Sequence, residues 1–243
     1  MTYVEGFLTP VPVARRDAYR AHADRAADLL LELGVTRLVE TWGEDVPHGV
    51  RTDMHRAVQA TPDEAVLFSW FEYPDRATRD AANDRIRSDP RFADMGRDMP
   101  FDARRMIYGG FASVSDVVGG GGGGKAGFVD GVVLPVRGGA RDAYRDHAAA
   151  LAPLFVEHGA LRVIDAIADD VPAGEVTDFA RAVAIEDREE VGFGWVEWPS
   201  RAVRDDAWAR LMADGRMTAA GDPPWNGQRM IFGGFAVLLD RTA

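Results

Sequence analysis

The chain has 243 residues, no cysteine and a formal net charge of −11 at pH 7. The missing cysteine excludes disulfides, thiol catalysis and thiolate metal sites. The acidic balance, with no basic block in either half, argues against binding to nucleic acid or to an anionic membrane surface. No basic-then-apolar signal opens the sequence, and no apolar stretch approaches the roughly 18 residues of a membrane span, so we expect a cytoplasmic protein.

The elements of the first 117 residues follow from hydrophobic spacing and turn residues. Glycine or proline ends several of them, and Asp75 is placed to cap the second long helix, as Ser200 is later in the chain. The spacing predicts, in order, a strand at Tyr3–Leu8, a helix at Ala14–Leu33, a strand at Thr36–Trp42, a loop at Gly43–Met54, a strand at Ala65–Tyr73, a helix ending near Arg87 and a strand at Arg104–Val114.

The same order then returns about 125 residues later. Arg16–Arg20 (RDAYR) recurs as Arg141–Arg145 (RDAYR), and Arg105–Phe111 (RMIYGGF) recurs as Arg229–Phe235 (RMIFGGF). A period of this length is that of a whole small domain. We therefore predict a first domain at residues 1–117, a glycine-rich linker at 118–126 and a second domain at 127–243.

The order strand, helix, strand, strand, helix, strand predicts an α+β fold, with each copy a ferredoxin-like domain. Such a domain leaves one apolar sheet face uncovered, which soluble monomers rarely tolerate. The glycine run Gly119–Gly124 lacks the lysine and helix of a phosphate loop, so it indicates a flexible linker. We predict that the two domains pack sheet to sheet as a barrel within one chain, a pseudo-dimer, which leaves room for two chains to pair further.

Several motifs resemble the YbaA-like proteins, a bacterial family with a domain of unknown function in the dimeric α+β barrel superfamily. The likeness spans both copies and is strongest in the closing RMIYGGF and RMIFGGF runs. The second copy departs from the first where Trp225 replaces Phe101 and Asn226 replaces Asp102. The resemblance implies the barrel fold, and relatives in the superfamily include cofactor-free oxygenases, isomerases, haem enzymes and binding proteins. Fold alone does not select among them.

Strand alternation places the bulky residues of the third strand of each copy on one face, which we assign to the barrel interior. They are Val66, Phe68, Trp70 and Glu72 in the first copy and Val191, Phe193, Trp195 and Glu197 in the second. One interpretation is a ligand pocket walled by these residues between the sheets, with Arg105 and Arg229 available for a ligand carboxylate. The other is an interior simply filled by the side chains, with both arginines in ion pairs.

Carboxylates recur at matching positions, as Glu5 and Asp130, Glu40 and Asp165, and Glu72 and Glu197. Burial raises the pKa of a carboxyl and makes it a candidate general base. We select Glu40 and Asp165 as the catalytic candidates.

His22 and His147 also recur, but we expect them at the rim of a helix. No metal-ligand spacing is present, so no metal or other cofactor is expected.

Two functions follow from these candidates. The first is the binding of a small organic molecule between the two sheets. The alternative is a cofactor-independent enzyme, of oxygenase or isomerase type, that acts on an aromatic or enolisable substrate with a carboxylate base. A filled barrel that works through its outer surface with another protein remains a third possibility.

Overall fold

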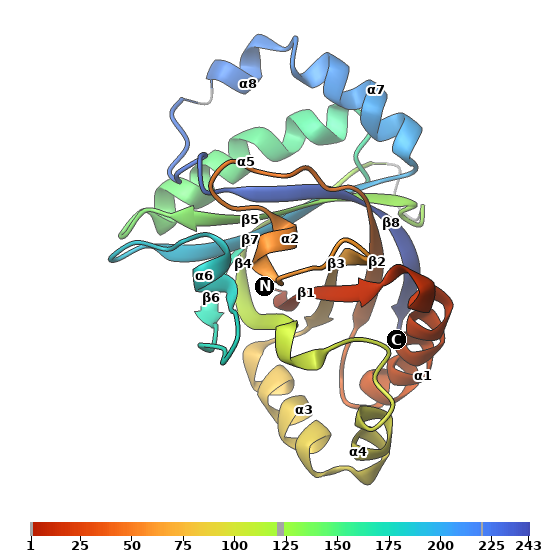
Figure 1. Ribbon diagram of the computed structural model, residues 1–243. Helices are drawn as coiled ribbons and strands as arrows, with labels where there is room; N and C mark the ends of the chain where they lie inside the picture. Colours follow the sequence, from red (N-terminus) through yellow and green to blue (C-terminus); the bar gives the residue numbers. More distant parts are fainter. Residues whose placement is uncertain (1, 121–123, 220) are drawn as a thin grey trace.

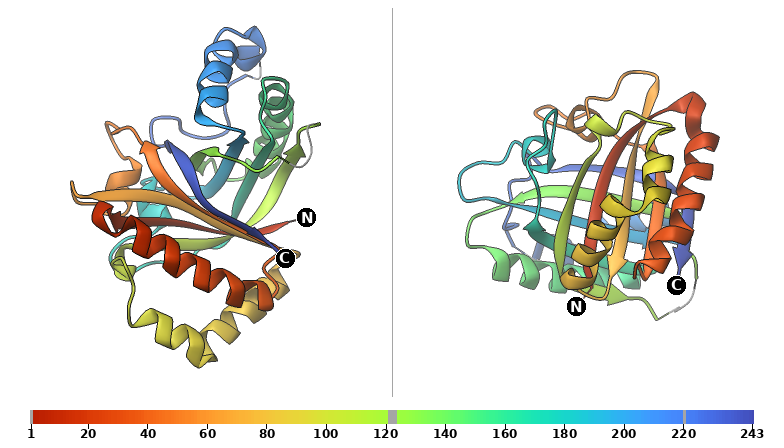
Figure 2. Two further views of the ribbon diagram at one scale, coloured as in Figure 1. Left: turned by 90° about the vertical axis from the view of Figure 1, so that its right-hand side faces the viewer. Right: turned by 90° about the horizontal axis from the view of Figure 1, so that it is seen from below.

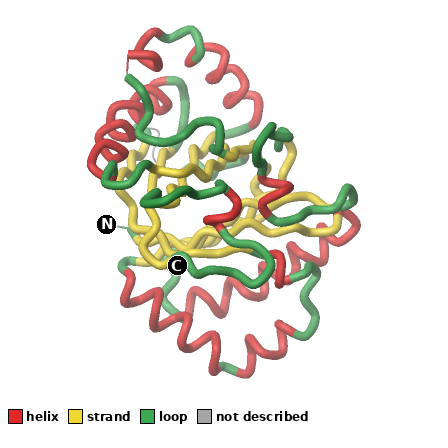
Figure 3. The backbone as a smooth tube through the Cα atoms, turned by 60° about the vertical axis from the view of Figure 1, so that its left-hand side comes forward, coloured by secondary structure: helices red, strands yellow, loops and turns green. Residues whose placement is uncertain are grey.

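The computed structural model describes residues 2–120, 124–219 and 221–243. Eight antiparallel strands form a closed barrel in the order β1-β3-β2-β8-β5-β7-β6-β4, with helices outside it on two opposite sides (Figures 1 and 3). The strands are β1 (Tyr3–Pro12), β2 (Arg37–Asp45), β3 (Glu64–Tyr73), β4 (Ile107–Val118), β5 (Phe128–Val136), β6 (Arg162–Asp170), β7 (Glu190–Trp198) and β8 (Ile231–Thr242). The predicted intrachain α+β barrel is confirmed.

The helices repeat in the same way in the two halves. The first half has α1 (Arg16–Glu32), α2 (Met54–Ala57), α3 (Arg76–Ser88) and α4 (Pro90–Gly96), and the second has α5 (Arg141–Glu157), α6 (Phe179–Ala182), α7 (Arg201–Leu211) and α8 (Gly215–Ala219). Single 3₁₀ turns, Val13–Arg15 and Ala103–Arg105, precede α1 and β4. Within the described residues, no helix combines the length and apolarity needed to cross a membrane.

All the predicted strands and long helices form, but β1, β2 and β4 continue three or four residues beyond their predicted ends, to Pro12, Asp45 and Val118. Asp75 and Ser200 accept hydrogen bonds from the backbone of Thr78 and Val203, so both predicted caps are confirmed. Gly34 has a positive φ of 99° just after α1, as a helix stop requires. The short helices α2 and α6 lie in or just after segments predicted as loops, and Asp53 caps α2 through the backbone of Arg56. Of the predicted linker, residues 121–123 lie outside the described part of the chain, and β4 already extends to Val118.

The last strand of each half joins the two halves. β4 pairs with β1 of its own half and then with β6 of the other, and β8 pairs with β5 and then with β2. Gly109 lies in this crossing region, where an added Cβ would approach Val171 of the other half to 2.9 Å. An added Cβ at Gly233 would likewise approach Val46 to 3.0 Å, so the first glycine of each RMI(Y/F)GGF motif allows close packing across the seam.

Both ends of the barrel are closed. At one end α2 and α6 pack into the barrel core, and Thr52 and Thr177 donate hydrogen bonds to the carbonyl oxygens of Ala182 and Ala57 in the opposite half. At the other end, where β3 and β7 finish, charged side chains meet across the opening. The two layers of long helices lie outside the strands, as Figure 2 shows, and α1, α3 and α4 cover the first half.

Candidate functional site

A cavity of about 280 Å³ lies in the first half, on the outer face of the sheet beneath α1. Its walls come from β1, β2, β3, α1, α3, α4 and the segment that leads to β4. Most of the lining is aromatic, aliphatic or thioether. The lining residues are Phe7, Thr9, Tyr19, His22, Ala23, Ala26, Leu30, Glu40, Ser69, Phe71, Ile86, Phe92, Met95, Gly96, Met99, Phe101 and Met106. This composition suits a mainly apolar small molecule held by a few polar groups.

Glu40 is the acidic group of this cavity. It lies on β2 next to a register shift between Glu40 and Thr41, where the strand pairs with β8 of the other half. The hydroxyls of Tyr19 and Ser69 each donate a hydrogen bond of 2.6 Å to Oε2 of Glu40. Burial raises the pKa of Glu40, and the two hydroxyls oppose that rise only in part. The hydrogen bonds fix the carboxyl while its other oxygen accepts no hydrogen bond from the described residues.

Tyr19 and His22 extend the polar end of the cavity along α1. Burial, followed by the charge of Glu40, raises the pKa of Tyr19 well above its ordinary value, so the phenol stays protonated and remains a donor. Burial, followed by the charge of Arg25, lowers the pKa of His22, which favours a neutral imidazole at pH 7. Nδ1 of His22 is buried without a hydrogen-bond partner among the described residues. The predicted rim histidine thus lines the cavity.

Asp165 occupies the matching place in the second half, with a different environment. The hydroxyl of Tyr144 donates a hydrogen bond of 3.0 Å to its Oδ1, while Gly194 stands where Ser69 stands in the first half. Burial raises the pKa of Asp165 to about 6. Glu40 and Asp165 therefore lie on opposite sides of the barrel, each under its own helix, and the structure does not bring them together.

The aromatic residues predicted to wall a pocket between the sheets lie in contact there. The rings of Phe68 and Phe193 stack at 4.5 Å, and those of Trp70 and Trp195 lie 4.3 Å apart. All four side chains are fully or almost fully buried. Gly6 and Gly131 face the stacked rings, and an added Cβ at either would approach the opposite phenylalanine to 2.6 Å. This packing fits the filled interior, and the cavity beneath α1 lies outside the space between the sheets.

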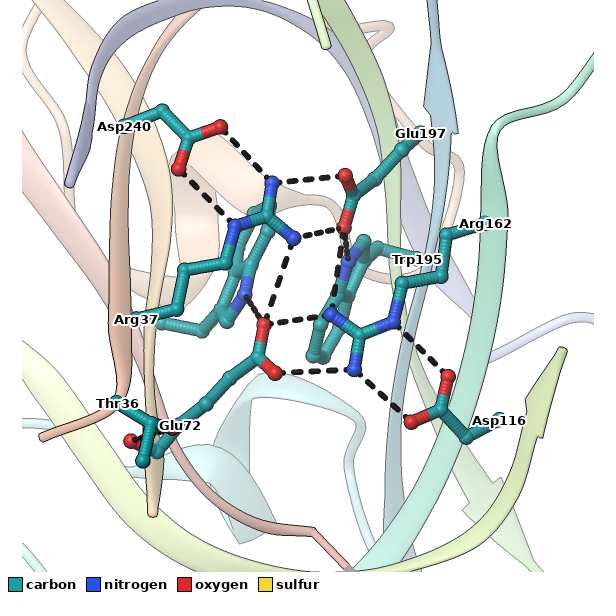
Figure 4. Close-up of polar contacts among 9 residues, drawn as sticks. Thr36, Arg37, Glu72, Asp116, Arg162, Trp195, Glu197 and Asp240 are labelled. Carbon is teal, nitrogen blue, oxygen red and sulfur yellow. Dashed lines mark hydrogen bonds and ion pairs between the residues drawn. The ribbon is translucent and has the colours of Figure 1, made fainter. Parts of the chain in front are cut away.

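Glu72 and Glu197 lie at the end of the barrel where β3 and β7 finish, in an ion-pair network across the two halves (Figure 4). Arg37 binds both oxygens of Glu197 at 2.8 Å, and Arg162 binds those of Glu72 at 2.8 and 2.9 Å. Asp240 and Asp116 bind the remaining faces of Arg37 and Arg162. The indole N–H groups of Trp70 and Trp195 donate to Glu72 and Glu197 at 3.1 Å.

The other predicted charged residues are also in ion pairs. Arg105 binds Glu64 through two hydrogen bonds of 2.6 and 2.7 Å, and this pairing lowers the pKa of Glu64 to about 2. Arg229 binds Glu189 in the same way. Glu5 and Asp130 bind Arg79 and Arg204, which reach Asp170 and Asp45 of the opposite half. Among the described residues, no group of three histidine, aspartate or glutamate side chains could hold a metal ion.

The profile of a family described as proteins of unknown function, DUF1428, matches residues 2–103 and again residues 127–228. The chain belongs to the DUF1428 family. The uncharacterised protein YbaA of Escherichia coli strain K12 is 53% identical over 116 residues, and YbaA of Shigella flexneri matches equally. The match covers 99% of YbaA and 48% of this chain, so the DUF1428 sequence occurs here as a tandem duplication.

Solved structures similar to this DUF1428 chain share its fold at low sequence identity. A provisionally assigned monooxygenase from Fusobacterium nucleatum has a TM-score of 0.61 at 10% identity and covers 99% of this chain and 94% of its own. Another from Lactobacillus acidophilus has a TM-score of 0.60 at 8% identity and covers 100% and 97%. An anthrone oxidase-like protein has a TM-score of 0.51 at 10% identity, over 100% and 93%. These likenesses show an α+β barrel fold and no activity.

Several cavity residues of this DUF1428 chain were not among the sequence candidates. They include the hydroxyl partners of Glu40, Tyr19 and Ser69, and the methionines Met95, Met99 and Met106. One signal was present, because Tyr19 and Tyr144 recur in the RDAYR repeat together with the acids that they bind. Ser69 has no such counterpart in the second copy, so the repeat could not indicate it.

Proposed function

We propose that this protein binds a small, neutral, mainly apolar molecule in the cavity beneath α1, and that Glu40 exchanges a proton with it. One observation carries this proposal: a buried carboxyl with a raised pKa lies in an apolar cavity, held by two hydroxyls and no cation among the described residues. A carboxylate in such a place is a stronger base than one in water. The ion-paired acids of the barrel have arginine partners and therefore lack this increased basicity.

The chemistry that fits is proton transfer on an enolisable or aromatic substrate without a resident cofactor. The carboxylate of Glu40 takes a proton from a carbon next to a carbonyl, and the electron pair forms the enolate. Where a C=C bond is conjugated with the enolate, return of the proton to the far carbon of that bond completes an isomerisation. In an oxygenase, molecular oxygen would be the co-substrate and would convert a CH₂ group to C=O with release of water. The monooxygenase-like neighbours are compatible with this second reaction through their fold only.

The test uses 2-tetralone, a neutral bicyclic ketone with an acidic CH₂ group, incubated with the protein in D₂O. We expect deuterium at C1 to form faster than in buffer, as measured by NMR. Glu40→Gln should lower the protein-dependent rate by about 10²–10⁴. Asp165→Asn is the matched control in the other half and should retain the rate. Equal losses in the two variants would contradict a role specific to Glu40.

Simple binding is the second candidate, and the apolar lining of the cavity favours it equally. A binder would retain 2-naphthol, an aromatic analogue of the 2-tetralone enol, without catalysing exchange. Titration calorimetry of the Gln variant separates the two functions, because an enzyme would lose exchange while its affinity for 2-naphthol changes little. Absence of both binding and exchange in the unaltered protein would refute the proposal.

The finer assignments also remain proposals. We propose that residues 1–117 and 127–243 are ferredoxin-like domains joined by 118–126, and the strand order β4-β1-β3-β2 within the first half supports this. Ligand binding between the sheets is the weaker alternative, because Phe68 stacks on Phe193 there. Native mass spectrometry of the purified protein would detect a retained compound and any pairing of two chains. The cytoplasmic location stays a prediction.

A further inference from the structure

The two halves differ in the segment before the last strand, which covers the cavity in the first half. Phe101 and His22 both line the cavity of the first half. Their counterparts are Trp225 and His147, whose rings lie 4.9 Å apart and nearly perpendicular, at 87°. The Trp225 ring also meets Tyr144 edge to face, with the ring centres 5.9 Å apart. In the first half the Phe101 ring meets Tyr19 at a similar distance of 5.7 Å, so the larger indole differs by reaching the histidine as well.

Backbone hydrogen bonds fix the segment that carries the Trp225 indole. Trp225 forms an isolated antiparallel bridge with Val136 at the end of β5. On either side of it, the amide of Arg137 donates to Pro224 at 3.0 Å, and the amide of Asn226 donates to Pro135 at 3.2 Å. A segment fixed on both sides of the tryptophan keeps the ring against α5.

We propose that the described part of the chain has one ligand site, the cavity beneath α1, and that the indole of Trp225 occupies the corresponding space in the second half. This inference rests on the proposed function. The cavity is lined mainly by aromatic, aliphatic and thioether side chains, which suits a flat aromatic ligand.

The size and charge of the first cavity agree with such a ligand. A cavity of about 150 Å³ is known to hold benzene, so about 280 Å³ is enough for two fused rings. None of the described residues that line the cavity is an arginine or lysine, and Glu40 would repel a second carboxylate or a phosphate. The ligand class is therefore a neutral bicyclic compound whose one polar group reaches Glu40.

Reciprocal exchange of the two aromatic residues tests this assignment with 2-naphthol as the probe. In titration calorimetry, the unaltered chain should bind one equivalent. Phe101→Trp should weaken binding at least about tenfold, and adding Trp225→Phe to that variant should restore one equivalent, now in the second half. Two equivalents in the unaltered chain, or full affinity in Phe101→Trp, would overturn the inference.

A measurement without ligand separates this inference from the proposed function. Trp225→Phe removes a ring from a filled space and should lower the denaturation midpoint, whereas Phe101→Trp fills an open cavity and should leave the midpoint unchanged or raise it. Equal decreases in the two variants would show that the halves are packed alike and would reject the inference. Opposite effects combined with no binding of 2-naphthol would support the filled second site and refute the proposed ligand class.

Discussion

Glu72 and Glu40 lie on neighbouring strands of one half and are both buried, yet their surroundings differ in kind. Glu72 receives two hydrogen bonds from Arg162, lies 3.5 Å from Arg37 and accepts the indole N–H of Trp70. Among the described residues, Glu40 has two hydroxyls as its only hydrogen-bond partners, and it lies against an apolar cavity. Full compensation of charge indicates a structural role. A carboxyl left without a cation beside a cavity costs stability and is the better functional candidate.

The largest expected effect concerns the compensated region. Arg37→Met would leave Glu197 and Asp240 without their shared cation while both remain largely buried. We expect a loss of about 3–5 kcal/mol in the free energy of unfolding, because the remaining charges stay desolvated. Urea denaturation measures this loss. Arg87→Met is the control, since Arg87 and Asp84 form an exposed pair worth about 0–1 kcal/mol. Similar losses in both variants would mean that the network stabilises the fold no more than an exposed ion pair does.

A pH effect of comparable size is expected from the uncompensated acids. Burial raises the pKa of Asp165 from 3.8 to about 6, so the folded state binds the proton more tightly than the unfolded state. This contribution to stability is complete below pH ~4 and is lost as the pH rises to about 6, by on the order of 3 kcal/mol. Asp165→Asn should remove that slope from denaturation curves taken between these pH values. An unchanged slope would contradict the raised pKa.

The stacked interior gives the next effect. In Gly6→Ala, the added methyl group would meet the ring of Phe193 at 2.6–2.9 Å, so the ring and its partner Phe68 must shift. We expect a loss of about 1–3 kcal/mol from overpacking, measured by the same denaturation. Gly227→Ala is the control, because an added Cβ there meets nothing within 4 Å. If Gly6→Ala were neutral, the barrel interior would have spare room, and ligand binding between the sheets would regain support.

The sequence predicted the barrel because duplication, strand alternation and caps are local or periodic signals. It also placed Glu40 and Asp165 among the candidates, since acids recur at the same positions of both copies. It could not place the cavity. Whether Phe68 and Phe193 wall a pocket or stack depends on the distance between the two sheets, which no single strand encodes. The long-range partners of Arg37 and Arg79 lie in the other half, so their pairing required the tertiary structure.

The smallest expected effect concerns the hydroxyl of Ser69, which has no counterpart in the second half. Ser69→Ala removes one of the two donors to Glu40, and it gives this position a side chain closer to Gly194 of the second half. We expect a loss of about 1 kcal/mol in stability.

The more informative quantity is the pKa of Glu40, which should rise further, because the Ser69 hydroxyl stabilises the charged form. The midpoint of the pH profile for deuterium exchange into 2-tetralone should therefore move to higher pH. Ser88→Ala, on the exposed end of α3, should leave both quantities unchanged. A merely structural hydroxyl would lower stability and leave the midpoint where it was, which would remove Glu40 from the proton transfer.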